Sequence, residues 1–352
     1  MSELRDFAGF SCPVPLPSND AVLLGHGSGG RLSAELLRKL ILPAFGNPVL
    51  DRLDDQAVIS VNGCRLAFTT DSFVVKPLFF PGGDIGSLAV HGTINDLAMG
   101  GARPLFLSVA LIIEEGLPME VLRRVVESLR ASARAAGVDV VTGDTKVVEK
   151  GSGDGLFINT SGIGLVAEGL DLSAGRARPG DRVLLSGAIG DHGIAILAKR
   201  EGLEFETVVE SDTAPLFSLV SAMLGVTRGF RCFRDPTRGG LSSALNEIAA
   251  QSRVGMAIEE RSIPVNEGVR SACELLGLDP LYVANEGKLV AIVEPENADS
   301  VLEAMRRHPL GCRAQIIGTV TEGHPGLVTM RTPLGTSRIV DLLDGDQLPR
   351  IC

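Results

Sequence analysis

The chain is poor in aromatic residues, with 13 Phe, one Tyr and no Trp among 352 residues. Its cores must therefore rest on Val, Leu, Ile and Ala. Net positive charge is also lacking, because 33 Lys and Arg stand against 43 Asp and Glu. This acidic balance argues against nucleic-acid binding, which needs basic patches. No apolar run approaches the ~18 residues that span a bilayer, and "MSELRDFAGF" lacks the features of a secretory signal. We therefore expect a cytoplasmic protein without nucleic-acid or membrane partners.

The six cysteines, at positions 12, 64, 232, 273, 312 and 352, form no C-x-x-C pair and no zinc spacing. Three disulfides are not expected in a large cytosolic chain with a good core. We interpret Cys64, Cys232, Cys273 and Cys312 as small core hydrophobes. Cys352 differs, because at the last position no downstream chain can pack it into a core. We expect it to be a mobile nucleophile.

The length favours two domains, and the order of predicted elements favours an α+β fold with mixed or antiparallel sheets. Residues 84–99 are predicted as a helix capped by Asp84 and ended by Gly100, and "PLFLSVALII" as a strand. In the first unit we expect paired helices on one face of the sheet. The predicted parts are a glycine-rich segment (1–40), an N-terminal domain (41–170), a C-terminal α+β domain (176–335) and a mobile tail (336–352).

Aspartates recur where predicted elements meet loops, at Asp55, Asp71, Asp144 and Asp235, and Asp96 lies within the helix 84–99. Carboxylates gathered around one cleft would repel one another unless a cation lay among them. Oxygen ligands in that number suit Mg²⁺ carrying phosphates. Each aspartate alone is more simply a helix cap or a solvated turn residue.

Two glycine-rich loops, "GHGSGG" (25–30) and "TRGG" (237–240), each open a predicted helix. Main-chain amides at a helix N-terminus form an anion site. Neither loop has the dinucleotide-binding or the Walker spacing, so a Rossmann or P-loop enzyme is not indicated. The two loops, with acidic strand ends between them, predict a site for nucleotide phosphate.

Other polar residues allow two interpretations. His91 and Asn95 lie four apart on one helix face, and His91 is either a core histidine or a site residue. Lys146 follows Asp144 by two residues and Glu286 stands in "NEGK". For both of these the alternative is an ordinary surface charge.

The segments "DDQAV", "TTDS", "PGGDIGSLAVHGTINDLAMGGARP", "TGDTKV", "DPTRGGL" and the ending "PRIC" together resemble one family. This is the HypE family of hydrogenase maturation factors. It belongs to the ATP-using superfamily that includes aminoimidazole ribonucleotide (AIR) synthetase and selenophosphate synthetase. The resemblance runs from about Gly25 to Cys352, and the Pro-Arg-Ile-Cys ending is specific to the HypE branch.

The resemblance implies a PurM-like (AIR synthetase-like) fold of two domains, with ATP binding and dimerisation in the first. It also implies an ATP-dependent carbamoyl dehydratase. The carbamoyltransferase HypF would place a carbamoyl group on the terminal cysteine, and ATP would drive its dehydration to a thiocyanate. The cyano group would pass to iron on the HypC–HypD complex, as a ligand of the [NiFe]-hydrogenase centre.

Matched onto this chain, the resemblance implies three sets of site residues. The Mg²⁺ and nucleotide ligands would come from Asp55, Asp71, Asn95, Asp96, Asp144 and Asp235. Further nucleotide contacts would come from Gly27, Ser28, Gly29, Gly30, Thr70, Gly239 and Gly240. The catalytic residues would be Cys352, Lys146, Glu286 and His91.

Two alternatives remain open from the sequence. A sister kinase such as selenophosphate synthetase would use a reactive residue near the N-terminus, yet Cys12 in "FSCPVPLP" lacks the expected glycine- and lysine-bearing surroundings. A non-catalytic scaffold would hold a metal through Cys352, but a single thiol is a poor metal site. In the dehydratase, a tail of roughly seventeen residues would reach at most ~60 Å and act as a swinging arm.

Overall fold

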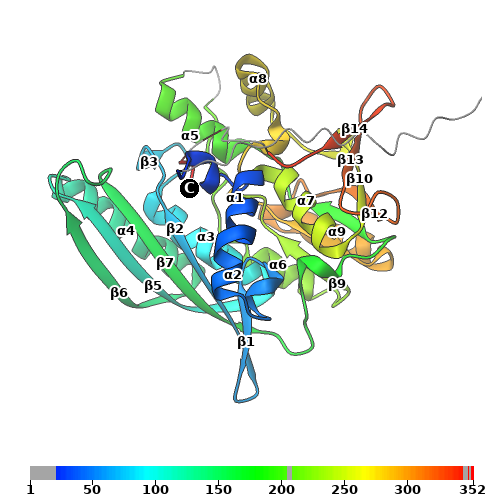
Figure 1. The fold of residues 1–352 in the computed structure, drawn as a ribbon, viewed down its shortest axis with the longest axis horizontal. Helices are drawn as coiled ribbons and strands as arrows, with labels where there is room; N and C mark the ends of the chain where they lie inside the picture. The colour runs from blue at the N-terminus through cyan, green and yellow to red at the C-terminus, as the bar shows by residue number, and fades with distance from the viewer. Residues whose placement is uncertain (1–20, 204–207, 344–347, 349) are drawn as a thin grey trace, which may run out of the picture.

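The computed structural model describes residues 21–203, 208–343, 348 and 350–352. It contains two α+β units that lie side by side, each built on its own sheet (Figure 1). The last residues of the chain return to the first unit, where the main-chain N–H of Val74 donates to the main-chain oxygen of Cys352 at 3.0 Å. The predicted α+β fold with mixed sheets is confirmed.

The first unit contains a five-stranded sheet in the order β1-β2-β7-β5-β6. Its neighbouring strands are antiparallel except β5 and β6, which are parallel and are joined through the helix α4. A small hairpin, β3–β4, precedes the helix α3. The bounds are β1 Ala57–Val61, β2 Cys64–Phe73, β3 Phe79–Phe80, β4 Gly83–Asp84, α3 Ile85–Met99, β5 Ala102–Glu114, α4 Met119–Ala136, β6 Asp139–Val148 and β7 Leu156–Val166.

The helices α3 and α4 cover one face of this sheet, as expected. The side chain of Asp84 caps α3 by accepting hydrogen bonds from the main-chain N–H groups of Gly86 (2.7 Å) and Ser87 (3.2 Å). The helix α3 is buried nearly all round, because the sheet, α4 and the second unit surround it. No helix in the described part of the chain is long and apolar enough to cross a membrane.

The opposite face of the first sheet is open on a single chain. Phe68, Phe106, Ile112 and Ile163 are exposed there, and the strand register places them on one side of the sheet. A sheet face this apolar is normally covered in the working molecule.

The second unit contains a seven-stranded sheet in the order β14-β13-β10-β12-β8-β11-β9, with helices on both faces. The strand β11, which lies between β8 and the edge strand β9, is buried along its whole length, because α7 packs on one face of the sheet and α6 with α9 on the other. The bounds are β8 Arg182–Leu185, α5 Asp191–Glu201, α6 Phe217–Leu224, β9 Phe230–Arg234, α7 Gly240–Ser252, β10 Gly255–Glu259, α8 Glu267–Leu276, β11 Val290–Val293, α9 Ala298–Arg307, β12 Gln315–Thr321, β13 Val328–Arg331 and β14 Ser337–Val340.

The described part of the glycine-rich segment forms a short 3₁₀ turn (Leu24–Gly27) and the helix α1 (Arg31–Leu36). The helix α1 continues through a π turn (Leu37–Ile41) into α2 (Leu42–Phe45). This segment contacts the second unit, since the main-chain N–H of Arg31 donates to the carbonyl of Leu343 at 3.0 Å. Gly30 is needed at this approach, because a Cβ there would lie 2.3 Å from the same carbonyl oxygen.

Three local expectations differ from the structure. The tail predicted to begin at 336 starts inside a hairpin, because β14 pairs antiparallel with β13. The sequence predicts a helix near 213–225, but α6 begins only at Phe217, since the preceding loop is bound to α3. Cys64 and Cys312 are exposed rather than core residues, whereas Cys232 and Cys273 are buried. All five described cysteines are free thiols.

Candidate active site

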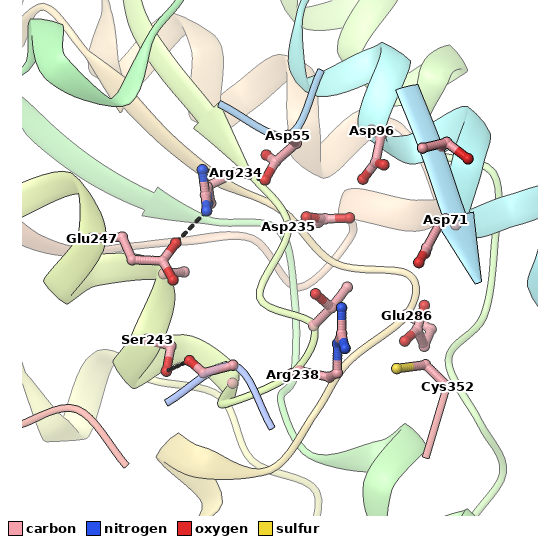
Figure 2. A pocket seen from close by; sticks show the side chains of 16 residues that line it. Asp55, Asp71, Asp96, Arg234, Asp235, Arg238, Ser243, Glu247, Glu286 and Cys352 are labelled. Carbon is pink, nitrogen blue, oxygen red and sulfur yellow. Dashed lines mark hydrogen bonds and ion pairs between the residues drawn. The ribbon is translucent and has the colours of Figure 1, made fainter. Parts of the chain in front are cut away.

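A cavity of about 250 Å³ lies between the two units, and both contribute to its wall (Figure 2). Cys352 reaches this cavity from the end of the chain, with its sulfur facing Arg238 and Glu286. The lining residues are Gly29, Asp55, Thr70, Asp71, Gly92, Asp96, Arg234, Asp235, Thr237, Arg238, Gly240, Ser243, Ala244, Glu247, Glu286 and Cys352.

The second unit reaches the cavity through the turn that joins β9 to α7. Gly239 and Gly240 both have left-handed φ angles, +76° and +61°. A Cβ on Gly240 would meet the carbonyl oxygens of Leu281 (2.5 Å) and Val283 (2.7 Å), so only glycine fits. The turn directs the N-terminus of the thirteen-residue helix α7 at the cavity, an arrangement that favours an anion.

Four of the six predicted metal ligands face this cavity, namely Asp55, Asp71, Asp96 and Asp235. Burial raises the pKa of Asp96 well above its usual value, and the charges of Asp235, Asp71 and Asp55 raise it further. Burial also raises the pKa of Asp235, to about 6. These carboxyl groups therefore resist ionisation together, and a cation among them would lower their pKa values.

Two arginines that were not predicted from the sequence, Arg234 and Arg238, place positive charge beside these carboxyl groups. Arg234 pairs with Asp55 at 3.2 Å and with Glu247, and these charges raise its pKa despite burial. The guanidinium of Arg238 donates to the carbonyl of Gly27 at 2.9 Å, and its pKa is raised chiefly by the negative charge that Cys352 carries when it is ionised. In the sequence, Arg234 directly precedes the motif "DPTRGGL" and Arg238 lies within it. Their position close to Asp235 could therefore have identified them as site residues.

The thiol of Cys352 is docked and protonated in this arrangement. Burial raises its pKa to about 12, Arg238 opposes that shift, and Glu286 and Asp71 add to it. The thiol is therefore not a free thiolate while it lies in the cavity. Nucleophilic attack by this sulfur requires either release from the cavity or removal of its proton there.

Glu286 is the buried carboxyl group best suited to act as a general acid or base. Its side chain is 4% exposed, and its Oε1 atom has no hydrogen-bond partner among the described residues. Burial raises its pKa well above the usual value, and Asp235 and Asp71 raise it further. A carboxyl with a raised pKa accepts a proton more readily near neutral pH.

Asn95 and His91 do not line the cavity. The amide of Asn95 donates to the carbonyls of Ala214 and Glu286, both at 3.1 Å, and accepts from the N–H of Leu216 at 2.8 Å. Its oxygen and both donors are thus engaged in joining the two units, so in this structure Asn95 does not face the cavity as the predicted metal ligand would. The Nδ1 atom of His91 lies 3.1 Å from the hydroxyl of Thr213, and burial lowers its pKa to about 4.

Asp144 and Lys146 also lie outside the cavity. They form an exposed ion pair on the edge strand β6, with Nζ–Oδ distances of 2.7 and 2.6 Å. The strand register places both on the open face of the first sheet, the face that carries Ile112 and Thr70. On a single chain, neither belongs to the site that the sequence analysis predicted.

The predicted glycines divide between two neighbouring cavities. Gly29 and Gly240 line the first, whereas Gly27, Ser28 and Gly239 line a second of about 190 Å³ on the other side of Arg238 and Cys352. Gly30 lines neither; it supports the loop through its close approach to Leu343. The two glycine loops do meet, because the hydroxyl of Ser243 donates to the carbonyl of Gly29 at 3.1 Å.

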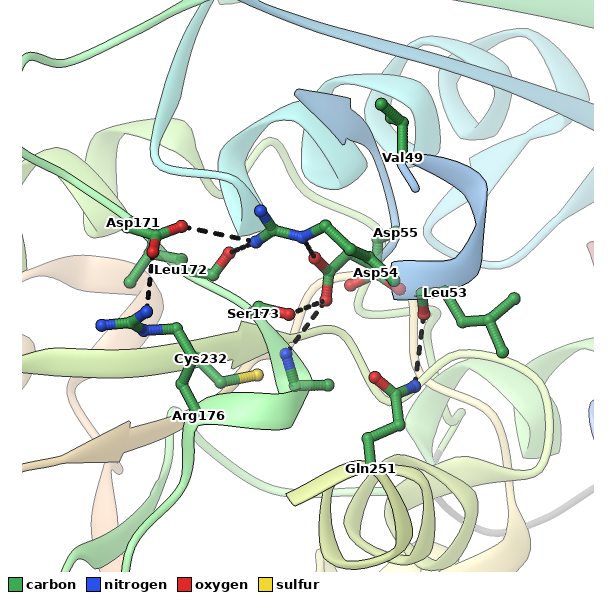
Figure 3. Close-up of polar contacts among 12 residues, drawn as sticks. Val49, Leu53, Asp54, Asp55, Asp171, Leu172, Ser173, Arg176, Cys232 and Gln251 are labelled. Atoms are coloured by element: carbon green, nitrogen blue, oxygen red, sulfur yellow. Dashed lines mark hydrogen bonds and ion pairs between the residues drawn. The ribbon is translucent and has the colours of Figure 1, made fainter. Parts of the chain in front are cut away.

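The neighbouring residues Asp54 and Asp55 point in different directions and make different contacts (Figure 3). The carboxylate of Asp54 accepts hydrogen bonds from Arg52 (2.9 Å), the hydroxyl of Ser173 (2.9 Å) and the main-chain N–H of Ala174 (3.0 Å). It thereby anchors the link between the units. Asp55 points away from this network and faces the cavity.

The donors in the cavity suit a hard cation, since they are carboxylate oxygens of which Glu286 Oε1 has no described partner. Within the described residues, however, no three acidic, His or Cys side chains are gathered closely enough to hold an ion by themselves. The residues therefore fit Mg²⁺ if phosphate oxygens and water supply the remaining ligands, which is its usual mode of binding.

Comparison with known families places both units in one class. Residues 53–166 match the family model described as "AIR synthase related protein, N-terminal domain". Residues 178–330 match its "C-terminal domain" counterpart. The fold and site thus define an AIR synthase-related protein of the PurM-like class.

Individual relatives give the particular family. The carbamoyl dehydratase HypE of Azotobacter vinelandii is 60% identical over 95% of this chain and 98% of its own length. A crystal structure of the hydrogenase maturation protein HypE in complex with ATP is 50% identical and superposes with a TM-score of 0.80 over 94% of this chain and all of that one. A HypE–HypF complex contains a chain that is 51% identical, with a TM-score of 0.84 over 88% of this chain and 99% of that one.

The chain belongs to the HypE family of carbamoyl dehydratases, which are hydrogenase maturation factors. It is therefore an enzyme. The two alternatives left open by the sequence, a selenophosphate synthetase-type kinase and a non-catalytic scaffold, are set aside.

Proposed function

We propose that this enzyme converts an S-carboxamide carried on Cys352 to a thiocyanate, with ATP as the dehydrating reagent. The observation that carries the proposal is the position of the Cys352 sulfur, in one cavity with four aspartates, Arg238 and Glu286. The overall change is R–S–C(=O)–NH₂ + ATP → R–S–C≡N + ADP + phosphate. The thiocyanate would supply the cyanide ligands of the [NiFe]-hydrogenase iron centre.

The reaction needs the amide oxygen to become a leaving group. The carboxamide oxygen would take the terminal phosphoryl group of ATP, and the C–O bond would break as phosphate departs. Mg²⁺ held by Asp55, Asp71, Asp96 and Asp235 would screen the charge of the phosphates. Preorganised amides at the N-terminus of α7 and in the glycine loops (Gly27–Gly30 and Gly239–Gly240), together with Thr70, would hold the same phosphates.

Two N–H protons must leave the carboxamide nitrogen as the triple bond forms. Glu286 is the proposed acceptor, because it is buried beside Cys352, its pKa is raised, and Oε1 has no described partner. Arg238 faces the sulfur and the cavity, where it would stabilise charge on the departing phosphate. His91, which is directed to Thr213, would act only through the loop that it contacts.

The roles predicted for Asp144 and Lys146 depend on a second copy of the chain. We propose a homodimer in which the open faces of two first sheets meet, burying Phe68, Phe106 and Ile163. Lys146 of one copy would then handle protons at the site of the other.

The proposed partners follow from the family. HypF would donate the carbamoyl group, as the HypE–HypF complex of a relative supports, and the HypC–HypD complex would accept the cyano group. Transfer between them requires the docked tail to leave the cavity, because Cys352 is only partly exposed where it lines the cavity wall.

The test is a mass spectrum of the C-terminal peptide after incubation with HypF, carbamoyl phosphate and ATP. We expect a carbamoyl adduct on Cys352, then a product lighter by one water. Glu286→Gln should accumulate the carbamoyl adduct without dehydration, and Cys352→Ala should give neither product while still binding ATP. A cyano adduct elsewhere on the Cys352→Ala chain would overturn the proposal, with Cys12 as the first residue to test.

A further inference from the structure

The end of the chain is held in a defined register rather than merely enclosed. Residues 350–352 run antiparallel to the segment 74–76. The N–H of Val74 donates to Cys352 and the N–H of Lys76 donates to the carbonyl of Arg350 (3.3 Å). A slip of one residue would move the sulfur by about 3.3 Å along the segment. It would also turn Ile351 out of the core that it shares with Phe73.

The side chain of Arg350 makes its own specific contacts with the first unit. Its guanidinium pairs with the carboxylate of Asp154, donates from Nε to the carbonyl of Val74 at 3.1 Å, and lies 5.9 Å from the ring of Phe157. From the second unit, Arg200 donates to the carbonyl of Arg350 at 2.6 Å. Both units therefore contact this one residue of the tail.

The next carbonyl along the chain, that of Ile351, is contacted by a buried histidine. His192 is fully buried, and its Nε2 atom lies 2.6 Å from the carbonyl oxygen of Ile351. Since a carbonyl only accepts, Nε2 carries the proton and Nδ1 accepts from the hydroxyl of Ser211 at 2.8 Å. That hydroxyl in turn accepts from the N–H of Thr213 at 3.2 Å, which is consistent with this tautomer.

We propose that Asp154, His192 and Arg200 are positioning residues that form a latch for residues 350–352 and so place the Cys352 sulfur in the cavity. The inference rests on the proposed function for its purpose, because the thiol must be both presented to the site and released from it. None of the three lines the cavity, so they act through the tail and not on the reacting atoms. The Asp154–Arg350 pair is partly exposed, which suits a contact that opens.

The test follows the alkylation of each cysteine of the full-length protein by iodoacetamide, read from peptide masses. In the unmodified chain, Cys352 should react far more slowly than the exposed Cys64 and Cys312. Asp154→Asn should speed alkylation of Cys352 roughly tenfold. Asp154→Glu should restore much of the protection. Glu322→Gln, an exposed loop substitution on the second unit, is the matched control and should change nothing.

Internal references separate release of the tail from general unfolding. Cys232 and Cys273 are each 1% exposed in the cores, so a loss of fold would expose them together with Cys352. Arg350→Gln should speed alkylation at least as much as Asp154→Asn, because it also removes the contact of Nε with the carbonyl of Val74. The double variant should be no faster than Arg350→Gln alone, because the Asp154–Arg350 pair is then already lost. Arg200→Gln should also speed alkylation of Cys352 alone.

Equal protection of Cys352 in the Asp154→Asn, Arg200→Gln and unmodified chains would overturn the latch. So would additive effects of Asp154→Asn and Arg350→Gln. The measurement needs neither carbamoyl phosphate nor ATP. A failure of the dehydratase chemistry would therefore leave this result unchanged, and a failure of the latch would leave the mass test of the chemistry unchanged.

Discussion

The amide of Asn95, in the C-terminal half of α3, donates a hydrogen bond to the carbonyl oxygen of Glu286 at 3.1 Å. This contact joins a helix of the first unit to the site loop of the second, across 191 residues of sequence. The position of the proposed base therefore depends on the packing of the two units.

The first prediction concerns this contact. Asn95→Asp would set a carboxyl oxygen against the carbonyls of Ala214 and Glu286, leaving buried acceptors unpaired. We expect a loss of about 2–4 kcal/mol in the free energy of unfolding, together with loss of dehydration. Denaturant unfolding measures the first effect. Asn47→Asp, in an exposed turn, is the control. Unchanged stability with loss of Mg²⁺ binding alone would instead restore Asn95 as a metal ligand.

The second prediction concerns the acidic cavity. A carboxyl whose pKa is raised by folding destabilises the folded state once the pH exceeds its unfolded pKa. Asp235, with a pKa of about 6, opposes folding at neutral pH by about 2–3 kcal/mol when no cation is bound. Asp235→Asn or Asp96→Asn should therefore raise the melting temperature without Mg²⁺ and abolish Mg-ATP turnover.

Calorimetry with EDTA and an ATPase assay with Mg²⁺ check the two halves of this prediction. Asp299→Asn, on the exposed side of α9, should change neither. Normal ATPase activity in both cavity variants would contradict the assignment of these carboxylates to the cation.

The third prediction is a pH dependence. Burial lowers the pKa of His91 from 6.5 to about 4. Between these pH values the imidazole is therefore protonated in the unfolded state but neutral in the folded state. The free energy of unfolding is therefore unaffected by His91 above about pH 6.5 and decreases as the pH falls toward 4. The total decrease is about 3 kcal/mol. His91→Gln should reduce the slope of unfolding free energy against pH in that interval. Identical slopes in the two proteins would refute it.

The fourth prediction tests the dimer. Sedimentation at micromolar concentration should show a homodimer, and Phe106→Arg, on the open sheet face, should give monomer. If Lys146 serves the site of the other copy, mixing Lys146→Ala with Cys352→Ala should restore about a quarter of the activity for random pairing, through one intact site per mixed dimer. No recovery from a mixture that is shown to exchange subunits would mean that Lys146 does not serve the site of the other copy.

Much of the local structure could be predicted from the chain. The bounds of α3 followed from Asp84 and the two glycines after Met99, because capping is decided within a few residues. The strand β7 could be recognised from its own alternating pattern, which the structure shows as alternate burial. Asp55, Asp71, Asp96 and Asp235 could be selected through the family motifs that carry them.

The site itself was decided by tertiary structure. Asn95 and Asp96 are adjacent in one motif, yet one binds the loop of the other unit and the other faces the cavity, because successive helix residues point about 100° apart. Asp144 belongs to a site motif but lies on an open sheet face.

The sequence by itself determined the family, the α+β class and the terminal thiol. Only the packing of the two units against each other decided that Arg234 and Arg238 meet the aspartates of the first unit and that Cys352 is docked among them. Such convergence depends on long-range contacts, for which no local pattern exists.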